Sequence, residues 1–261
     1  MDVFSSLSLL RPPKFLQLWK QLLPEQKYWV NGNSLDMPQR LRMDLLSGCP
    51  DEAMLAIAEV SALAQWKTSQ LHNGSLSYPE LIRRGTAIEQ QLRQFPSNDH
   101  DARLQGTNNA MQPTQEDRSL AASIFREAAL LFLHTVLSNS MPGKSLHHKT
   151  SRWLIETFLL LDVPEISASV GNIVHLLAQL PPSDIDRSLV FPICFAGSMT
   201  DDSTRRDFFK GRLRGLNENF GNLLQIRRLM EVVWQKRDLG GKEVDIRETL
   251  REQQGLNLLL I

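Results

Sequence analysis

Net charge, cysteine and long apolar runs are all scarce in this sequence of 261 residues. The 29 basic and 29 acidic side chains balance, so the overall charge favours neither a nucleic acid nor an anionic membrane as a partner. Only two cysteines occur, Cys49 and Cys194, which is typical of reduced intracellular thiols, and we interpret both as structural. No run approaches the ~20 apolar residues of a membrane span, and the first residues lack the basic region of a secretory signal. We therefore expect an intracellular protein without a membrane partner.

Catalytic motifs are missing too. There is no Gly-x-Ser-x-Gly elbow, and neither cysteine has an activating sequence context. Gly143-Lys144-Ser145 imitates the end of a phosphate-binding loop, but Ser138 stands where the first glycine belongs and a predicted helix precedes it. The carboxylates of Asp184 and Asp186, at a predicted helix start, are explained by capping. We predict that the chain is not an enzyme and assign no catalytic or cofactor-binding residues.

Metal-ligand patterns are equally weak. His147 and His148 are adjacent, so on a helix they point in different directions. His134 and His175 lie in apolar helical runs, where we expect hydrogen-bonded core histidines. The triplet 99–101 (Asp-His-Asp) has suitable ligand types, but it lies in a polar segment where solvated charge is the better explanation. We predict no metal site, and ligand-binding residues stay unknown.

Helical periodicity recurs along most of the chain, and the alternation typical of strands is absent, which predicts an all-α fold. We expect an irregular multi-helical domain of roughly ten helices. Helix pairs could stack as in a solenoid, although no fixed sequence period supports this. The predicted helices cover residues 14–23, 35–46, 51 to the break at 73–74, 77 to 96, 114–138, 147–161, 164–180, 185–197, 203–216, 219–237 and 244–253.

Residues 97–113 are rich in Asn, Asp, Gln and Gly, which predicts a polar flexible insert. This insert separates an N-terminal helical part, residues 1–96, from a C-terminal helical part, residues 114–261. We treat residues 1–261 as a single helical domain with an internal boundary at the insert.

The C-terminal part contains a distinctive stretch. Pro192 suits the first turn of a helix, and Ala196-Gly197 would let another backbone approach closely. Asp201, Asp202 or Ser203 can cap the next helix. The apolar residues of that helix recur at helical spacing and are predicted to be core, as is a later tryptophan; they are Phe209, Leu213, Leu216 and Trp234.

The same helix is locally basic, with Asp207 as its only acid. Its cationic side chains would fit a solvated surface face, which we favour, or contacts with nucleic-acid phosphates. These side chains are Arg205, Arg206, Lys210, Arg212 and Arg214.

Residues 189–197, the acids at 201–202 and residues 205–209 together resemble the fungal-specific transcription factor domain, which is found downstream of Zn2Cys6 DNA-binding clusters. Residues 46–67, 81–89, 233–237 and 244–260 also look like this family. The resemblance implies an all-α regulatory or effector domain in the nucleus. Its implied partners are coregulator proteins or other parts of a longer transcription factor, with a small-molecule effector or a second copy of the chain as further options.

One departure from that pattern matters for DNA binding. A Zn2Cys6 cluster needs six cysteine thiolates, and this chain has two, so we expect neither a zinc cofactor nor DNA binding by this chain alone. The sequence therefore favours a regulatory domain of a fungal transcription factor that acts through protein or ligand contacts. A helical interaction module without a DNA-binding partner domain, and a metabolite-binding receptor, stay open as alternatives.

Overall fold

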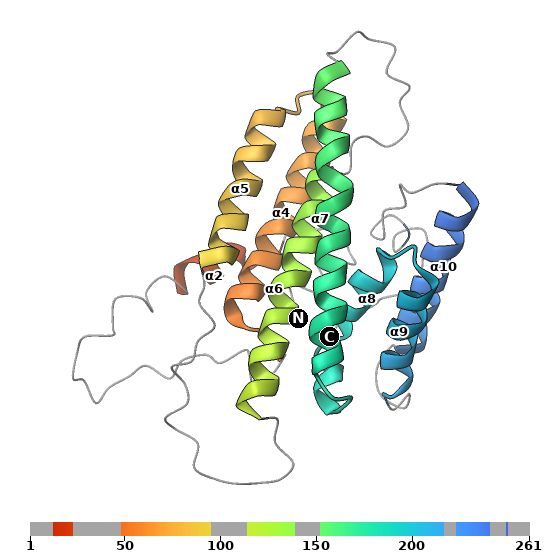
Figure 1. Ribbon diagram of the computed structural model, residues 1–261. Coiled ribbons are helices and arrows are strands. Elements are labelled where there is room, and N and C mark those ends of the chain that lie inside the picture. The colour runs from red at the N-terminus through yellow and green to blue at the C-terminus, as the bar shows by residue number, and fades with distance from the viewer. Residues whose placement is uncertain are drawn as a thin grey trace, which may run out of the picture.

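The computed structural model describes residues 13–22, 48–94, 114–138, 152–216, 223–240 and Thr249, with the backbone alone for residues 115, 152–163, 184 and 240. All regular structure in these ranges is helical, which confirms the all-α class (Figure 1). The elements are α2 (Leu16–Leu22), α4 (Asp51–His72), α5 (Tyr78–Gln94), α6 (Gln115–Ser138), α7 (Arg152–Gln179), the 3-10 turn η3 (Asp184–Arg187), α8 (Val190–Ser198), α9 (Ser203–Arg214) and α10 (Leu223–Gly240).

The described residues thus hold eight α-helices where we expected roughly ten. The predicted helix at 35–46 and the insert at 97–113 lie outside those residues, as does the helix at 244–253 apart from Thr249. Stacking of helix pairs as in a solenoid stays a prediction.

One predicted break is wrong. We expected separate helices on either side of Pro164, but Pro164 lies inside the single helix α7. An internal proline removes one backbone hydrogen bond and costs about 3 kcal/mol or more in a helix. Packing compensates for that loss, because α7 lies along α6 for much of its length (Figure 1).

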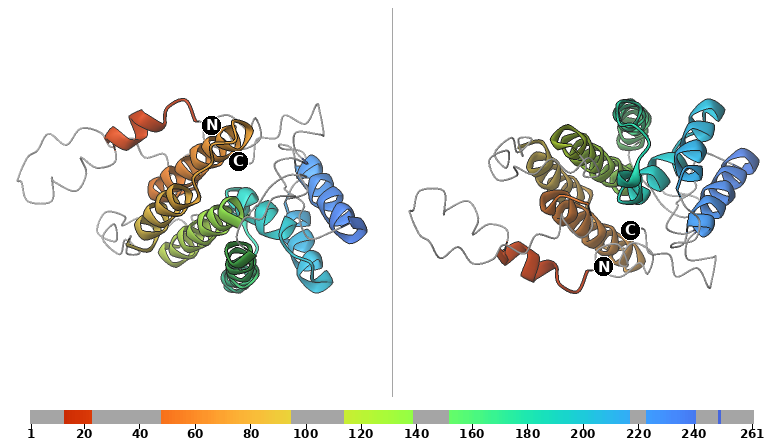
Figure 2. Two further views of the ribbon diagram at one scale, coloured as in Figure 1. Left: turned by 90° about the horizontal axis from the view of Figure 1, so that it is seen from above. Right: turned by 90° about the horizontal axis from the view of Figure 1, so that it is seen from below.

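Helix α6 is the centre of the molecule and contacts α4, α5, α7 and α8 (Figures 1 and 2). A helix with a single neighbour would bury one side. Instead, consecutive residues are buried on all sides of this helix, as expected for one surrounded by others. The buried side chains include Ile124, Phe125, Ala128, Ala129, Leu131, Phe132, Leu133 and Val136. We expected no segment with the length and composition of a membrane span, but residues Glu116–Ser138 meet both criteria. Their burial in the core explains this apolar composition.

Helix starts follow the expected caps in part. The Thr114 hydroxyl accepts a bond from the backbone N–H of Asp117 (3.1 Å), whose carboxylate accepts from the N–H of Thr114 (3.0 Å), forming a reciprocal cap for α6. At α5 the Ser77 hydroxyl accepts from the N–H of Glu80 at 3.5 Å. The Glu80 carboxylate, however, binds Arg83 and Arg84, so the Ser77–Glu80 capping box is only half formed.

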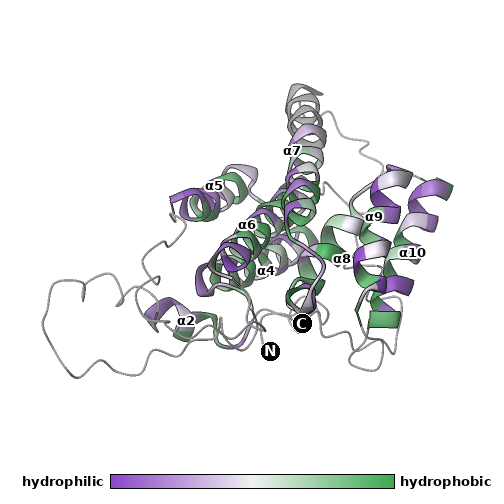
Figure 3. Cartoon of the chain, turned by 60° about the horizontal axis from the view of Figure 1, so that its bottom comes forward, coloured by the Kyte–Doolittle hydropathy of each residue, from purple (hydrophilic) through white to green (hydrophobic). Residues whose placement is uncertain are grey.

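Helix α5 carries one apolar stripe on a largely hydrophilic helix (Figure 3). Leu81, Ile88 and Leu92 are buried as predicted, but Ile82 is 47% exposed. Ile82 directly follows Leu81, and adjacent residues on a helix point about 100° apart, so the two cannot share the narrow face toward the core. Gly85 brings α5 close to α6, because a Cβ at this position would lie 2.7 Å from Leu137 Cδ2.

Candidate functional site at the junction of α8, α9 and α10

The stretch that carried the family resemblance folds into one cluster, the junction of α8, α9 and α10 with the turn at 199–202. All nine residues of α8 are buried, and Pro192 lies in its first turn as predicted. Phe195 packs edge-on against Phe132 of α6 with ring centroids 5.4 Å apart, so α8 joins this cluster to the central helix. Helices α9 and α10 lie on the far side of α8, away from α5 (Figure 2).

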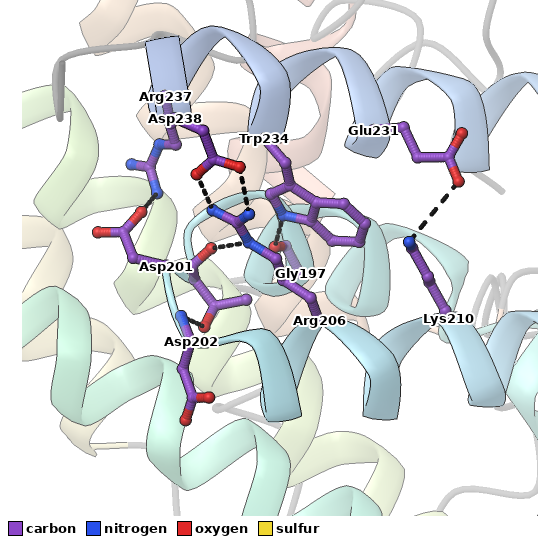
Figure 4. Close-up of polar contacts among 10 residues, drawn as sticks. Gly197, Asp201, Asp202, Arg206, Lys210, Glu231, Trp234, Arg237 and Asp238 are labelled. Atoms are coloured by element: carbon purple, nitrogen blue, oxygen red, sulfur yellow. Dashed lines mark hydrogen bonds and ion pairs between the residues drawn. The ribbon is translucent and has the colours of Figure 1, made fainter. Parts of the chain in front are cut away.

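Gly197 permits the close approach that the sequence predicted. A Cβ on Gly197 would lie 2.4 Å from Met230 Cε of α10 and 3.3 Å from Phe209 Cβ of α9. The Gly197 carbonyl oxygen accepts a 2.8 Å hydrogen bond from the indole nitrogen of Trp234 (Figure 4). Trp234 is 4% exposed, which confirms it as a core anchor.

Helix α9 begins at Asp202, whose carboxylate accepts a bond from the backbone N–H of Thr204 at 2.8 Å. This confirms capping by one of the three predicted residues. Phe209, Leu213 and Leu216 are buried, again as predicted. An acidic cap is favourable here because the N-terminus of a helix carries partial positive charge.

Two arginine–carboxylate pairs join α10 to α9 and to the turn at 199–202, which precedes α9 (Figure 4). Arg206 donates two hydrogen bonds to Asp238, at 2.8 and 2.9 Å, and a third to the Thr200 carbonyl oxygen at 3.2 Å. Arg237 of α10 donates to Asp201 at 3.2 Å. The bonds from Arg206 lower the pKa of Asp238, whereas burial lowers the pKa of Arg237. Both pairs therefore link charged groups across different elements.

A third pair lies deeper. Arg212 of α9 donates to Asp186 of η3 at 2.5 Å and to the Leu180 carbonyl oxygen at 2.8 Å. The side chains of Arg212 and Asp186 are 7% and 2% exposed. Burial raises the pKa of the Asp186 carboxyl, and the positive charge of Arg212 opposes that rise. Arg212 therefore fixes α9 to η3 through Asp186 and to the residue after α7 through the Leu180 carbonyl oxygen.

These contacts change the interpretation of the basic helix. Arg206, Lys210 and Arg212 each pair with a carboxylate on another element, the Lys210–Glu231 distance being 3.8 Å. Arg212 is buried, so the favoured prediction of a solvated face is wrong for it. Arg205 lies 3.7 Å from Asp202, and Arg214 is exposed. Contacts with nucleic-acid phosphates are disfavoured because most of this positive charge is already neutralised within the molecule.

The two cysteines are buried thiols, in agreement with a structural role. Burial raises the pKa of the Cys49 thiol well above its ordinary value and that of Cys194 to about 12. Neither thiol is therefore activated as a nucleophile.

The histidine predictions are partly wrong. His175 is exposed and lies 2.8 Å from Gln179 rather than in the core, because Ile173 and Leu177, two positions away on either side, take the inward face of α7. His134 is half-buried, and its Nδ1 has no hydrogen-bond partner in the part of the chain that the structure describes.

The other sequence candidates lie outside the described residues; they are 99–101, 143–145 and 147–148. Across the side chains that the structure does describe, no three His, Cys, Asp or Glu residues gather so that they could hold a metal ion.

Comparison with known proteins places the sequence in a family. The model of the fungal-specific transcription factor domain matches residues 1–261. A trichothecene biosynthesis transcription regulator of Fusarium sporotrichioides is 28% identical over 88% of this chain and 48% of its own length. Its namesake in Trichoderma arundinaceum is 29% identical over 87% of this chain and 47% of its own length. A transcription factor of Pestalotiopsis microspora is 25% identical over 91% of this chain and 36% of its own length.

The chain thus spans about half the length of the first two relatives. No solved structure matches it. The matching proteins are transcription regulators and not enzymes, in agreement with the prediction made from the sequence. The chain belongs to the fungal-specific transcription factor domain family.

Proposed function

We propose that this chain is the regulatory domain of a fungal transcription factor and controls transcription through protein or ligand contacts, without binding DNA itself. The observation that carries the proposal is the family match over all 261 residues. The relatives are about twice as long, so we infer that coregulator proteins or other parts of a longer transcription factor are the partners of this domain. Its place of action is then the nucleus.

Two features of the described residues support a role without direct DNA contact. Arg206, Lys210 and Arg212 are engaged with acids inside the fold. Both cysteines are buried in the apolar core. A Zn2Cys6 cluster needs six cysteine thiolates that can reach zinc, so these two do not form one. These features support our proposal that DNA recognition belongs to another part of a longer transcription factor and that this chain acts without zinc.

The printed names of the relatives narrow the biological process. Two regulate trichothecene biosynthesis, and another, from Aspergillus flavus, is a transcription factor of the ustiloxin B cluster. We extend this to the present chain and propose that its targets are the genes of a biosynthetic cluster. Identities of 25–29% leave the target genes themselves unassigned.

A tethering assay tests the proposal. The chain is fused to an unrelated DNA-binding domain, and transcription of a reporter that carries the matching site is measured in a filamentous fungus. We expect reporter output to differ clearly from that of the DNA-binding domain alone. A fusion carrying Trp234→Ala, matched for protein level, serves as the control with a damaged junction.

Two outcomes would contradict the proposal. The first is unchanged reporter output from a fusion whose folded state is verified. The second is tight, sequence-specific DNA binding by the purified chain alone in a mobility-shift assay, because the proposal assigns no DNA contact to this chain.

A further inference from the structure

The last turn of α10, residues 235–240, differs from the rest of the helix in how it is held. Upstream of it, apolar side chains anchor α10 at helical spacing. These anchors are Leu223, Ile226, Leu229, Met230, Val233 and Trp234, each at most 7% exposed. Beyond Trp234 no described side chain of the helix is a buried apolar group, and Leu239 is 88% exposed. Among the described side chains, Trp234 is therefore the last buried apolar anchor of α10, which ends at Gly240.

Two ion pairs contribute to holding these last six residues, and Arg237 also donates to the Met199 sulfur at 3.7 Å. Asp238 accepts two bonds from Arg206, and its neighbour Arg237 donates to Asp201, so adjacent residues of opposite sign pair with opposite partners (Figure 4). The two arginine side chains are 15% and 10% exposed, whereas both aspartates are 60% exposed. Because the carboxylates face water, dissolved ions can screen both pairs.

Once the Arg206–Asp238 and Arg237–Asp201 pairs are lost, the charge at the helix end favours unwinding of residues 235–240. Asp238 lies near the C-terminus of α10, where the partial negative charge of the helix disfavours an acid. Arg206 offsets that repulsion in the closed state. Arg206 is itself held by the Thr200 carbonyl oxygen and lies over the Trp234 ring at 5.4 Å, so the partner that would move is the last turn of α10.

We propose that residues 235–240 form an ionic latch that closes when the Arg206–Asp238 and Arg237–Asp201 pairs form and opens when they are screened or neutralised. Residues 223–234 stay in place in both states, because their apolar anchors do not depend on charge. The latch gives the domain a switch at the end of α10 that responds to the concentration of dissolved ions.

Hydrogen exchange on the purified chain tests the latch. Amide exchange is measured by mass spectrometry at about 0.01 M and about 1 M sodium chloride, between which the screening length falls from about 30 Å to about 3 Å. We expect exchange in residues 235–240 to rise about fivefold to thirtyfold at high salt, as for a loss of one or two kcal/mol. Exchange in residues 226–234 should stay unchanged. Equal exchange of the last turn at both salt concentrations overturns the proposal.

Variants separate the latch from general charge effects. The double variant Asp201→Asn with Asp238→Asn should show the open exchange pattern at low salt and lose its salt dependence, while its melting temperature stays near that of wild type. Asp207→Asn is the matched control, because Asp207 is an exposed aspartate on α9 outside both pairs, and it should behave as wild type. Wild-type exchange in the double variant, or the open pattern in Asp207→Asn, would exclude the latch. These readouts do not involve transcription, so they stand or fall separately from the reporter assay.

Discussion

The indole nitrogen of Trp234 donates a 2.8 Å hydrogen bond to the carbonyl oxygen of Gly197, 37 residues earlier in the chain. The same glycine lacks the Cβ that would collide with Met230, one turn before Trp234 on α10. Two pieces of the family resemblance, around Gly197 and around Trp234, are thus a donor and its acceptor in one contact. The resemblance reflects how α10 is seated on α8.

Trp234→Ala removes both the buried ring and this hydrogen bond. We expect the free energy of unfolding to fall by about 3–5 kcal/mol, the usual range for a large truncation in a core. Trp234→Phe keeps most of the ring and should lose less, about 1–3 kcal/mol from the missing partner of a buried carbonyl. Chemical denaturation measures both values. A melting temperature close to wild type for the alanine variant would show that Trp234 is not an anchor.

Gly197→Ala should cost less in one of two backgrounds. In the wild type the new Cβ meets Met230 Cε at 2.4 Å, and we expect overpacking to cost about 1–3 kcal/mol. In a Met230→Ala background that atom is gone and the 3.3 Å contact with Phe209 Cβ remains, so the same substitution should cost less than in the wild type. A double-mutant cycle by denaturation measures the coupling. If the two substitutions change the free energy of unfolding additively, the new Cβ does not collide with Met230.

Two Asp→Asn substitutions at arginine pairs should differ sharply in cost. Asp186→Asn leaves Arg212 buried with its charge uncompensated, for which we expect a loss of about 3–5 kcal/mol. Asp238→Asn removes an exposed partner of Arg206, and the global stability should change far less. Equilibrium unfolding of both variants under one set of conditions tests the contrast. Equal losses would contradict the difference in burial.

The carboxyl group of Glu80 should have an unusually low pKa. Hydrogen bonds from Arg83 and then Arg84 lower its pKa from 4.5 to about 2. Because folding lowers this pKa, the unfolded chain binds more protons between those values. The stabilisation by this carboxylate is therefore complete above about pH 4.5 and is lost as the pH falls through about 2. An NMR titration of the Glu80 carboxyl measures the value. It should rise in Arg83→Gln, and an unchanged value there would refute the assignment.

Local patterns predicted the helical class and most of the apolar contacts at the junction. Phe209 and Leu213 could be placed in the core because their spacing is a local property of one helix. Pro164 misled the prediction for the same reason, since the local cost of a proline was considered without the α6 surface that supports α7.

The ion pairs could not be predicted in the same way. Arg206 and Asp238 are 32 residues apart, and Arg212 and Asp186 are 26 apart, so no periodicity within one helix joins them. On α9 alone, Arg206 and Arg212 look like ordinary members of a basic surface. The two arginines differ in the burial of their partners, because η3 places Asp186 in the core and α10 places Asp238 at the surface.

The central position of α6 also bears on the order in which the protein is made. During synthesis α4 and α5 leave the ribosome before α6, but α7 and α8, which cover its remaining sides, leave later. Until α8 has left the ribosome, the part of the apolar surface of α6 that it covers lacks this partner. Phe195, near the end of α8, packs against Phe132, so we expect a nascent chain that stalls before this point to be more prone to aggregate than the full 261 residues.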